Sequence, residues 1–395
     1  MKFDDFRFDE ITLNYDKERI PLSAMEREKR QGIYKYYGAQ GIIDYVNDYI
    51  FDGKYLLIAE DGENLKSKKQ NIAQIVEGQF WVNNHAHIVK CNEKCILEYL
   101  AYLVNCKDVS GYITGSAQPK LSQANLNAMT FNIPPVVYQK KCLSVLLPIE
   151  HKIKLNTDIN NNLEQQAQAI FKEWFIDNPE NENWSNGTFS ELIQSTLSGD
   201  WGKEAPTGNN TEKVYCVRGA DIPEVRAGNK GKMPTRYILP KNYASKKLTA
   251  GDIVVEISGG SPTQSTGRCT AISESLLNRY DSGMVCTNFC RAIKPLSGYS
   301  MFIYYYWQYL YDKGVFFSYE NGTTGIKNLD ISGFLGTEPI IIPPKEKVLA
   351  FDDYCQTVFD RIFANGKESE QLSQLRDTLL PKLMSGELDV SDIEL

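Results

Sequence analysis

The chain has 395 residues, of which 42% are hydrophobic and 24% charged, and its formal net charge is −7 at pH 7. This composition is typical of a globular protein of two or three domains, and no apolar run approaches the length that spans a bilayer. The negative net charge argues against a protein that coats DNA without sequence preference. Because the amino terminus lacks an apolar signal core, we expect a cytoplasmic protein.

The nine cysteines are an odd number scattered over a long chain, which favours free thiols over a disulfide framework. Two pairs have C-x3-C spacing, Cys91 with Cys95 and Cys286 with Cys290. A zinc site would need a second close pair or a histidine cluster, and the chain has only three histidines. We therefore interpret these cysteines as buried small side chains and expect no metal site.

In chain order, the sequence predicts a strand-rich domain over 1–140, a helical segment over 141–178 and a second strand-rich domain over 179–344. A second helical segment follows over 345–388, and an acidic tail occupies 389–395. Both strand-rich domains are made of short apolar runs separated by glycine and proline, such as Ile253–Ile257.

The second half of the chain repeats the first. Asp-Gly-Lys-Tyr-Leu-Leu-Ile-Ala-Glu-Asp-Gly62 aligns with Ala-Gly-Asp-Ile-Val-Val-Glu-Ile-Ser-Gly-Gly260 at an offset of 198 residues, and Asn84–Lys90 aligns with Asn288–Lys294 at 204. The turn Gly115–Lys120 aligns with Gly322–Lys327 at 207, and Ile133-Pro-Pro aligns with Ile342-Pro-Pro at 209. A repeat of about this length indicates two copies of a whole domain followed by a helix.

The two helical segments share one heptad-like pattern in the same register, 209 residues apart. Steps of four and three residues from Cys142 meet Leu146, Ile149, Ile153, Asn156, Asn160, Leu163, Ala167, Ile170 and Trp174. The same steps from Phe351 meet Cys355, Val358, Ile362, Asn365, Ser369, Leu372, Arg376, Leu379 and Leu383. This period predicts helices that pack along a seam, and the polar positions at its centre are typical of residues that fix register. We expect Pro148 to mark a kink or a helix start, and Pro381 to bend or end the second helix.

The alternative for these segments is a pair of ordinary amphipathic helices, each packed on its own domain. Their shared register favours mutual pairing. We therefore expect an α+β fold with two pseudo-symmetric mixed α/β domains, separated by two long helices packed as an antiparallel coiled coil. At about 1.5 Å per residue, Ile149–Phe175 would span roughly 40 Å, close to the 34–36 Å of one turn of B-DNA.

Positive charge is concentrated in the second domain, where nine Lys and Arg residues lie between Lys213 and Lys247 against only Asp221 and Glu224. Such a stretch in an acidic protein fits one face that meets a polyanion, although a solvated, loop-rich surface is the alternative.

Several motifs resemble the specificity subunits of type I restriction–modification systems. The segment Leu372-Ser-Gln-Leu-Arg-Asp-Thr-Leu-Leu-Pro-Lys-Leu-Met-Ser-Gly-Glu-Leu388 resembles their carboxy-terminal conserved region, and Leu163-Glu-Gln-Gln-Ala-Gln-Ala-Ile-Phe-Lys-Glu-Trp-Phe175 resembles the central one. Gly-Asp-Ile-Val at 251–254, Asn-Gly-Thr-Thr-Gly-Ile-Lys at 321–327 and the Ile-Pro-Pro motifs resemble parts of their target recognition domains. The resemblance runs from about Ile11 to Leu388.

The resemblance implies that each domain reads one half of a bipartite, asymmetric DNA site, and that the helices set the spacing between the halves. It also implies that the helices dock two copies of the adenine methyltransferase subunit, and that a motor–nuclease subunit joins the complex. S-adenosylmethionine, ATP and Mg would belong to those partners, so the chain would hold no cofactor and no catalytic residue. In agreement, the sequence has no phosphate-binding loop, no dinucleotide-binding glycine motif and no methyltransferase Asn/Asp-Pro-Pro-Tyr motif.

The candidate DNA contacts are loop residues that donate or accept hydrogen bonds, or that carry positive charge. In the second domain they are Arg218, Lys230, Lys232, Arg236, Ser261, Gln264, Arg268, Thr323, Thr324 and Lys327. In the first domain they are Tyr34, Lys35, Tyr37, Gln40, Lys66, Lys68, Lys69, Ser116, Gln118 and Lys120. For each residue, plain solvent exposure is the alternative. The shared glycine turn is the strongest candidate, because a lysine beside small residues suits a phosphate.

A function of another class stays open, namely a non-catalytic two-domain scaffold whose helices bind proteins and whose domains bind peptide or glycan. The absence of enzyme motifs is compatible with it, but it does not explain the carboxy-terminal motif or the helix spacing.

Overall fold

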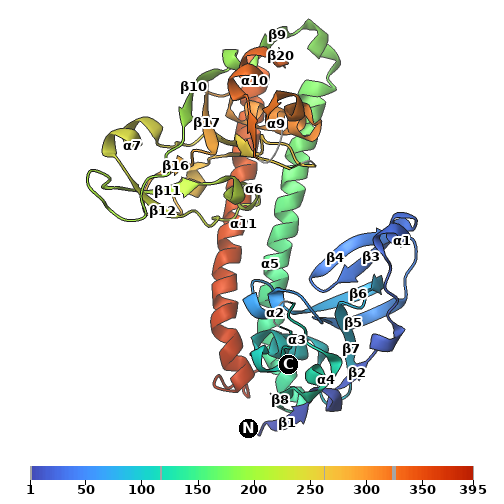
Figure 1. The fold of residues 1–395 in the computed structure, drawn as a ribbon. Helices are drawn as coiled ribbons and strands as arrows, with labels where there is room; N and C mark the ends of the chain where they lie inside the picture. The colour runs from blue at the N-terminus through green and yellow to red at the C-terminus, as the bar shows by residue number, and fades with distance from the viewer. Residues whose placement is uncertain (1, 116–117, 262, 323–325, 395) are drawn as a thin grey trace. The chain divides into compact units, whose positions relative to one another are not determined.

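The computed structural model describes residues 2–115, 118–261, 263–322 and 326–394. Two compact units divide the chain, one formed by Met1–His151 with Ser373–Leu395 and the other by Lys152–Leu372. Each unit contains a sheet-based domain and one part of each of two long helices, which are labelled α5 and α11 in Figure 1. Within the described residues, no helix is both long enough and apolar enough to cross a membrane.

The first unit is built on a six-stranded mixed sheet of order β2-β7-β5-β6-β3-β4, and a separate strand pair joins β1 to β8. Its strands are β1 (Asp4–Arg7), β2 (Thr12–Asn14), β3 (Gln31–Gly38), β4 (Gly41–Val46), β5 (Phe51–Ala59), β6 (Ala73–Val82), β7 (Ala86–Cys91) and β8 (Thr130–Ile133). Its short helices are α1 (Ala24–Glu28), α2 (Asn64–Ser67), α3 (Leu97–Cys106) and α4 (Gln123–Ala128).

The second unit holds a four-stranded sheet of order β10-β17-β13-β15 and three-stranded sheets of orders β12-β11-β16 and β14-β19-β18, and β20 pairs with β9. Its strands are β9 (Ser185–Thr188), β10 (Ile193–Ser198), β11 (Glu212–Val217), β12 (Thr235–Ile238), β13 (Ile253–Glu256), β14 (Ser258–Gly259), β15 (Cys269–Ala271), β16 (Met284–Cys286), β17 (Cys290–Pro295), β18 (Glu320–Asn321), β19 (Lys327–Leu329) and β20 (Pro339–Ile342). Its short helices are α6 (Ile222–Arg226), α7 (Pro240–Lys246), α8 (Glu274–Leu277), α9 (Ser300–Asp312) and α10 (Ile331–Thr337).

The strand order agrees with the predicted duplication. The order β2-β7-β5-β6-β3-β4 becomes β10-β17-β13-β15 and β16-β11-β12, so the single long strand β6 corresponds to the two short strands β15 and β16. The segment between them includes α8. In both units the pairing equivalent to β3 with β6 is parallel.

The register corrects one detail of the alignment. Leu57 pairs with Ile88 and Val254 pairs with Ala292, while Ile88 and Ala292 are 204 positions apart. Leu57 and Val254 are therefore equivalent, which makes the offset in this strand 197 rather than 198.

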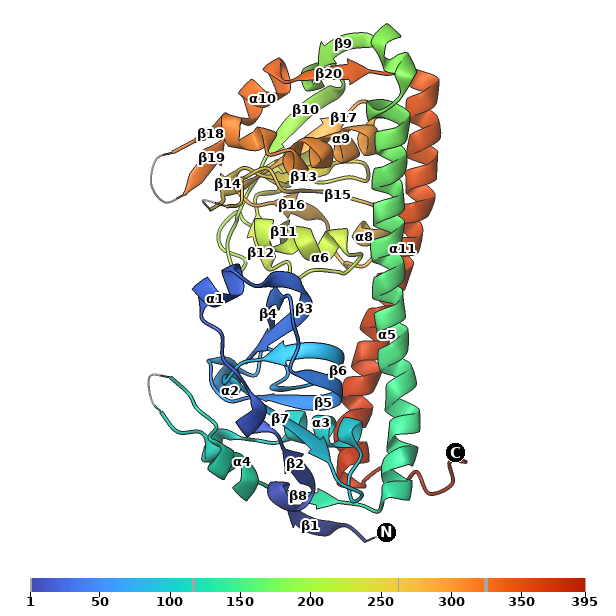
Figure 2. The same ribbon diagram turned by 90° about the vertical axis from the view of Figure 1, so that its right-hand side faces the viewer.

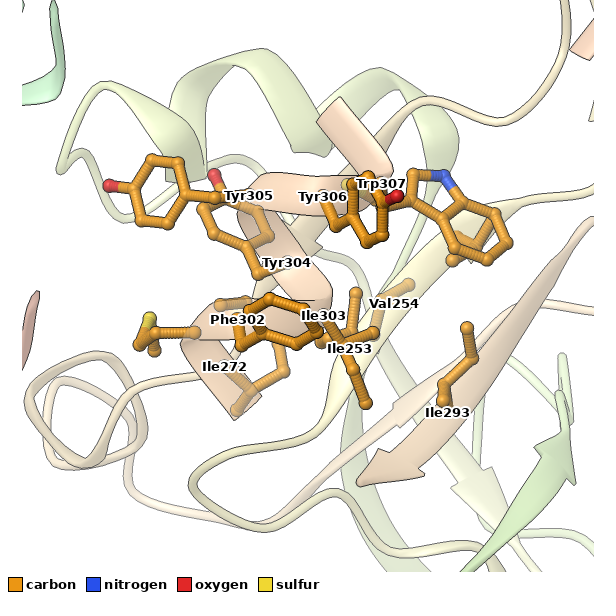
Figure 3. Packing of buried hydrophobic residues seen from close by; sticks show 14 of the residues in the cluster. Ile253, Val254, Ile272, Ile293, Phe302, Ile303, Tyr304, Tyr305, Tyr306 and Trp307 are labelled. Carbon is orange, nitrogen blue, oxygen red and sulfur yellow. The ribbon is translucent and has the colours of Figure 1, made fainter. Parts of the chain in front are cut away.

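The core of the second unit forms where α9 packs on the sheet (Figure 3). Apolar and aromatic residues surround this helix on nearly all sides, which is typical of a fully buried helix. Its buried run Phe302–Trp307 lies against Ile253 and Val254 of β13 and Ile293 of β17. The Trp307 indole Nε1 donates to the Gly267 carbonyl at 2.7 Å, so its polar atom is satisfied in the core.

The two long helices are α5 (Val136–Phe171) and α11 (Lys345–Ser385), which lie side by side in Figures 1 and 2. Both begin directly after a Pro-Pro pair, as expected for proline at a helix start. Contacts in each unit show that they are antiparallel, because Cys142 bonds to Leu383 and Glu150 lies near Arg376, while Asn160 bonds to Ile362. A π-helical turn, Lys172–Ile176, follows α5.

Both prolines lie inside these helices. The expectation of a helix start at Pro148 or an end at Pro381 is wrong, since α5 and α11 run through them. A proline removes one backbone hydrogen bond and so disfavours the helix locally. Packing against the partner helix stabilises it, and a prediction from local propensity does not include that packing. The helices begin at Val136 and Lys345, compared with predicted segment starts at 141 and 345. The carboxy-terminal tail packs on the first unit, where Tyr138 Oη donates to the Leu388 carbonyl and Val390 is buried.

Candidate nucleic-acid interface

The predicted helix-pairing residues lie on α5 and α11, and hydrogen bonds join Asn156 and Asn160 to Ile362, Asn365 and Ser369. Asn156, Asn160, Val358, Ile362 and Asn365 are buried, and Ile149, Ile153, Leu163, Ser369 and Leu372 are half-buried. The polar centre is a hydrogen-bonded network. Asn365 Nδ2 donates to Asn160 Oδ1 at 2.8 Å, and Asn156 Nδ2 donates to Glu368 Oε2 at 2.8 Å and to Ser369 Oγ at 3.3 Å.

This network also holds the second domain on the helices. Asn160 Nδ2 donates to the Ala227 carbonyl at 3.1 Å, and Arg279 Nη2 donates to Glu370 Oε2 of α11 at 2.8 Å. A Cβ added at Gly366 would lie 1.9 Å from the Gly228 oxygen, so α11 and the domain backbone meet here without room for a side chain.

In the second unit, the two predicted loop regions are brought side by side. Strand β14, which follows β13, pairs with β19, and β19 pairs with β18, so Gly259, Asn321 and Lys327, which lie at the ends of the two loops, belong to one small sheet. Gln264 is exposed and its backbone N–H donates to Ser261 Oγ at 3.0 Å. Thr323 and Thr324 lie outside the described residues.

Two of the cations predicted in and beside these loops of the second unit have carboxylate partners. Arg268 donates to both oxygens of Glu256, at 2.8 and 2.7 Å, and these bonds raise the pKa of Arg268. Lys327 Nζ lies 2.7 Å from Glu320 Oε2. Burial would raise the pKa of Glu320, but Lys327 and the bonds from Thr266 outweigh it, and the pKa lies below its usual range. These cations hold the loops in place, so direct contact with DNA stays a prediction for them.

One residue of the basic stretch, Arg218, lines a hollow of about 550 Å³ in the second unit, together with Trp201, Glu256 and Phe289. Arg218 is held by both oxygens of Asp221 and by the Lys232 carbonyl. The Asp221 bond raises the pKa of Arg218. The guanidinium of Arg236 lies 3.8 Å from the ring centre of Trp201, which also lines the hollow. The Lys230 ammonium lies over the Tyr280 ring at 4.6 Å, and Lys232 is exposed.

The first unit brings together the corresponding loops. The Thr114 and Lys120 backbones bond to each other in both directions at 2.8 Å, and the Gly62 N–H donates to the Pro119 carbonyl at 3.1 Å. Gln118 is exposed, and Ser116 lies outside the described residues. Lys120 Nζ lies 3.1 Å from Glu60 Oε1, so in both units the lysine of the shared turn has a glutamate partner.

Two further predicted cations, Lys66 and Lys68, line a hollow together with Gly115. Lys68 Nζ donates to the Lys107 carbonyl at 3.2 Å, while Lys66 and Lys69 are exposed. Lys68 has a left-handed backbone, with φ of 48°.

Residues Tyr34–Gly38 form part of strand β3 and not the loop that the sequence predicted. Lys35 and Gln40 are exposed, whereas Tyr34 is half-buried against Tyr49. Tyr37 is 8% exposed and packs against Phe80, so its ring is not available for stacking on a base. The preceding residue Tyr36 is also buried, in a separate cluster, so both faces of the strand are covered at this point.

Beneath the loops of the first unit lies a buried ionic network that the sequence did not reveal. His87 is fully buried, with Nδ1 2.6 Å from Asp16 Oδ2 and Nε2 2.8 Å from the Leu121 carbonyl. Burial would raise the pKa values of Asp16 and Glu60, but His87 and Arg19 contribute to lowering both below their usual range.

Among the residues that the structure describes, no group of three or more His, Cys, Asp or Glu side chains could hold a metal ion. Burial raises the pKa of Cys290 to about 11 and places that of Cys286 above its usual range. The Cys91 pKa is raised by its hydrogen bond to Cys95. Thiols that resist ionisation are poor metal ligands.

Sequence reasoning missed the carboxylates that pair with the predicted cations and two exposed aromatic residues beside the hollow. Phe289 is 60% exposed and Trp201 is 37% exposed. The sequence did carry a signal for Phe289. At the turn before the repeated strand, the second copy has this large apolar residue where the first copy has His85.

Comparisons with known proteins agree with this architecture. Residues 2–165 match the family model of the type I restriction modification DNA specificity domain. The chain is 24% identical over 410 aligned positions to the type I restriction enzyme HindI specificity subunit of Haemophilus influenzae, covering 85% of this chain and 84% of that protein. It is 27% identical to the type I restriction enzyme MjaIX specificity subunit of Methanocaldococcus jannaschii, covering 75% and 70%.

A further Haemophilus influenzae protein, named as type I restriction enzyme specificity subunit S.HindORF215P, is 27% identical over 64% of each chain, slightly less than two thirds of its length. Among solved structures, the S subunit of a type I restriction–modification system from M. genitalium has the same fold, with a TM-score of 0.59 at 12% identity, covering 97% of this chain and 96% of that one. The matched domain, the duplicated strand order and the paired helices agree with the earlier resemblance. Over its length the chain is therefore similar to type I restriction–modification specificity subunits, and its first part matches their DNA specificity domain.

Proposed function

We propose that this chain is the DNA-recognition subunit of a type I restriction–modification complex. Each domain reads one half of a bipartite, asymmetric site, and the paired helices set the spacing and dock the methyltransferase subunits. The observation that carries the proposal is a repeated arrangement, because in each unit backbone hydrogen bonds join the ends of the same two loops. A protein with two related surfaces on one helix pair suits a split DNA sequence.

The chain acts without catalysis of its own. Its partners are double-stranded DNA, two copies of an adenine methyltransferase subunit and one type of motor–nuclease subunit, which bind S-adenosylmethionine, ATP and Mg. The complex works in the cytoplasm. The names of the relatives support DNA specificity as the role of this chain, and no comparison favours the scaffold that binds protein or glycan.

Co-expression with a methyltransferase subunit encoded beside this chain, followed by genome-wide mapping of N6-methyladenine, tests the proposal. We expect methylation of one split motif, present with both proteins and absent when either is omitted. A complex that forms without methylating any motif would overturn the proposed recognition role. A methyltransferase that produces the motif without this chain would also overturn it.

A further inference from the structure

Each unit carries an equivalent two-residue turn at the same end of its sheet, which we call the strand-end turn. It is Asn84–His85 between β6 and β7 in the first unit, and Asn288–Phe289 between β16 and β17 in the second. Both turns are exposed, and each directly precedes the repeated strand β7 or β17.

Backbone hydrogen bonds show that the two turns are equivalent position by position. Before the turn, the Asn83 N–H donates to the Tyr37 carbonyl at 3.0 Å, and the Thr287 N–H donates to the Val217 carbonyl at 2.9 Å. After it, the carbonyls of His85 and Phe289 each accept at 2.9 Å, from the N–H groups of Glu60 and Ile257. Asn84 therefore corresponds to Asn288, and His85 corresponds to Phe289.

The first position is the same in both units, and the second differs in chemistry. The His85 side chain is 49% exposed, and its Nδ1 donates to Asp61 Oδ2 at 2.6 Å, which leaves Nε2 toward other partners. Phe289 is 60% exposed and lines the hollow of about 550 Å³ together with Trp201, Arg218 and Asn288.

The surroundings of the second turn favour DNA as the occupant of this surface. Arg218 lines the hollow beside it, and Arg236 stacks on Trp201, so two guanidinium groups lie near the exposed aromatic residues. Their carboxylate partners are Asp221 and Glu204. Phosphate contacts position a protein on the duplex, whereas polar and apolar side chains on a rigid support read the base edges. The strand-end turns have that support, because main-chain bonds hold both of their ends.

We propose that the strand-end turns are specificity-determining elements of the two domains. Asn84 and Asn288 each recognise an adenine through the amide, and the next position sets the difference between the half-sites. Phe289 contacts the methyl group of a thymine, whereas His85 requires a polar base edge. An amide suits the N6 and N7 of adenine, and the thymine methyl is the apolar feature of the major groove. This inference rests on the proposed function and assigns the residues that carry it.

Methylation mapping with the complete complex tests the assignment, using Phe289→Ala, Phe289→His and His85→Phe. The first two should relax or change one half of the motif, with about tenfold loss of preference at one position, and His85→Phe should change only the other half. Leu296→Ala is the matched control, because Leu296 is 39% exposed and directly follows the opposite end of β17, about 20 Å from Phe289. It should leave both halves unchanged.

A second measurement tests the thymine contact. Oligonucleotides with deoxyuridine in place of each thymine of the half-site lack one methyl group at a time. At one position the complex with the unaltered chain should methylate about tenfold more slowly, and the Phe289→Ala complex should show no further loss there. If no position responds, the thymine contact is wrong.

The failure of the inference differs from the failure of the proposed function. A normal split motif that all three variants leave unchanged overturns the strand-end turns and keeps the function, whereas no motif with the unaltered chain overturns the function itself. If Phe289→Ala abolishes methylation altogether, Phe289→Leu decides. If the Phe289→Leu complex retains the motif, an apolar contact is supported. If Phe289→Leu changes the half-site as strongly as Phe289→His does, the apolar contact is contradicted.

Discussion

At the scale of single residues, the ion pairs divide the predicted DNA contacts into two kinds. Lys232 is exposed, whereas Lys327 pairs with Glu320, whose side chain is 5% exposed. We expect Lys232→Ala to weaken DNA binding equally for all sequences, and to reduce the slope of log affinity against log salt by about 1. Lys327→Met should instead lower the free energy of unfolding by about 1–3 kcal/mol, because it leaves a buried acceptor unpaired. Titrations at several salt concentrations and urea unfolding measure both, and a stable Lys327→Met protein with a reduced salt slope would contradict this division.

The buried pair of Asp16 and His87 makes stability depend on pH. The folded pKa of Asp16 lies below its unfolded value of about 3.9, so between the two values the folded state binds fewer protons. The stabilisation is present above the unfolded pKa and is lost as the pH falls through the folded pKa. Asp16→Asn should therefore lose less stability than the unaltered protein between pH 5 and pH 3, as measured by urea unfolding. The exposed Asp9→Asn is the control, and equal pH dependence of the Asp16 variant and the unaltered protein would refute the assignment.

At the scale of elements, the packing of the second domain on α11 depends on one close contact, between Gly366 and Gly228. Gly366→Ala would place its Cβ 1.9 Å from the Gly228 oxygen, so we expect a loss of about 1–3 kcal/mol of stability from overpacking. Gly336→Ala in α10 meets nothing within 4 Å, and it should be neutral or stabilising by up to about 1 kcal/mol. Thermal unfolding of both variants measures the difference, and similar behaviour of the two would show that the contact is not tight.

At the scale of the whole molecule, the long helices keep apolar side chains at the surface. Val137, Leu147 and Leu155 of α5 and Leu349 and Leu375 of α11 are 39–62% exposed. Methyltransferase subunits docked on the helices would cover such surface, so we expect the isolated chain to self-associate and co-expression to increase the monodisperse fraction. Size-exclusion chromatography with light scattering measures it. Equal amounts of well-behaved monomer with and without the partner would count against this docking surface.

The sequence by itself determined the duplication, the pairing of the long helices and the polar centre at Asn156, Asn160 and Asn365. These features follow from repeated sequence motifs and from a 3.5-residue period, and both can be recognised in short segments of the chain. It also placed Gln118, Lys232 and Gln264 at exposed positions near the loops.

Only the tertiary structure decided which cations are paired and which side chains face outward. His87 meets Asp16 across 71 positions, and the strand-end turns are fixed by bonds from other strands. Only the tertiary structure shows that both helices continue through Pro148 and Pro381, and that Tyr37 is buried in the core. The physical reason is that these outcomes depend on packing and on electrostatic contacts between segments far apart in the chain. The local sequence pattern and the propensity of single residues contain no information on such contacts.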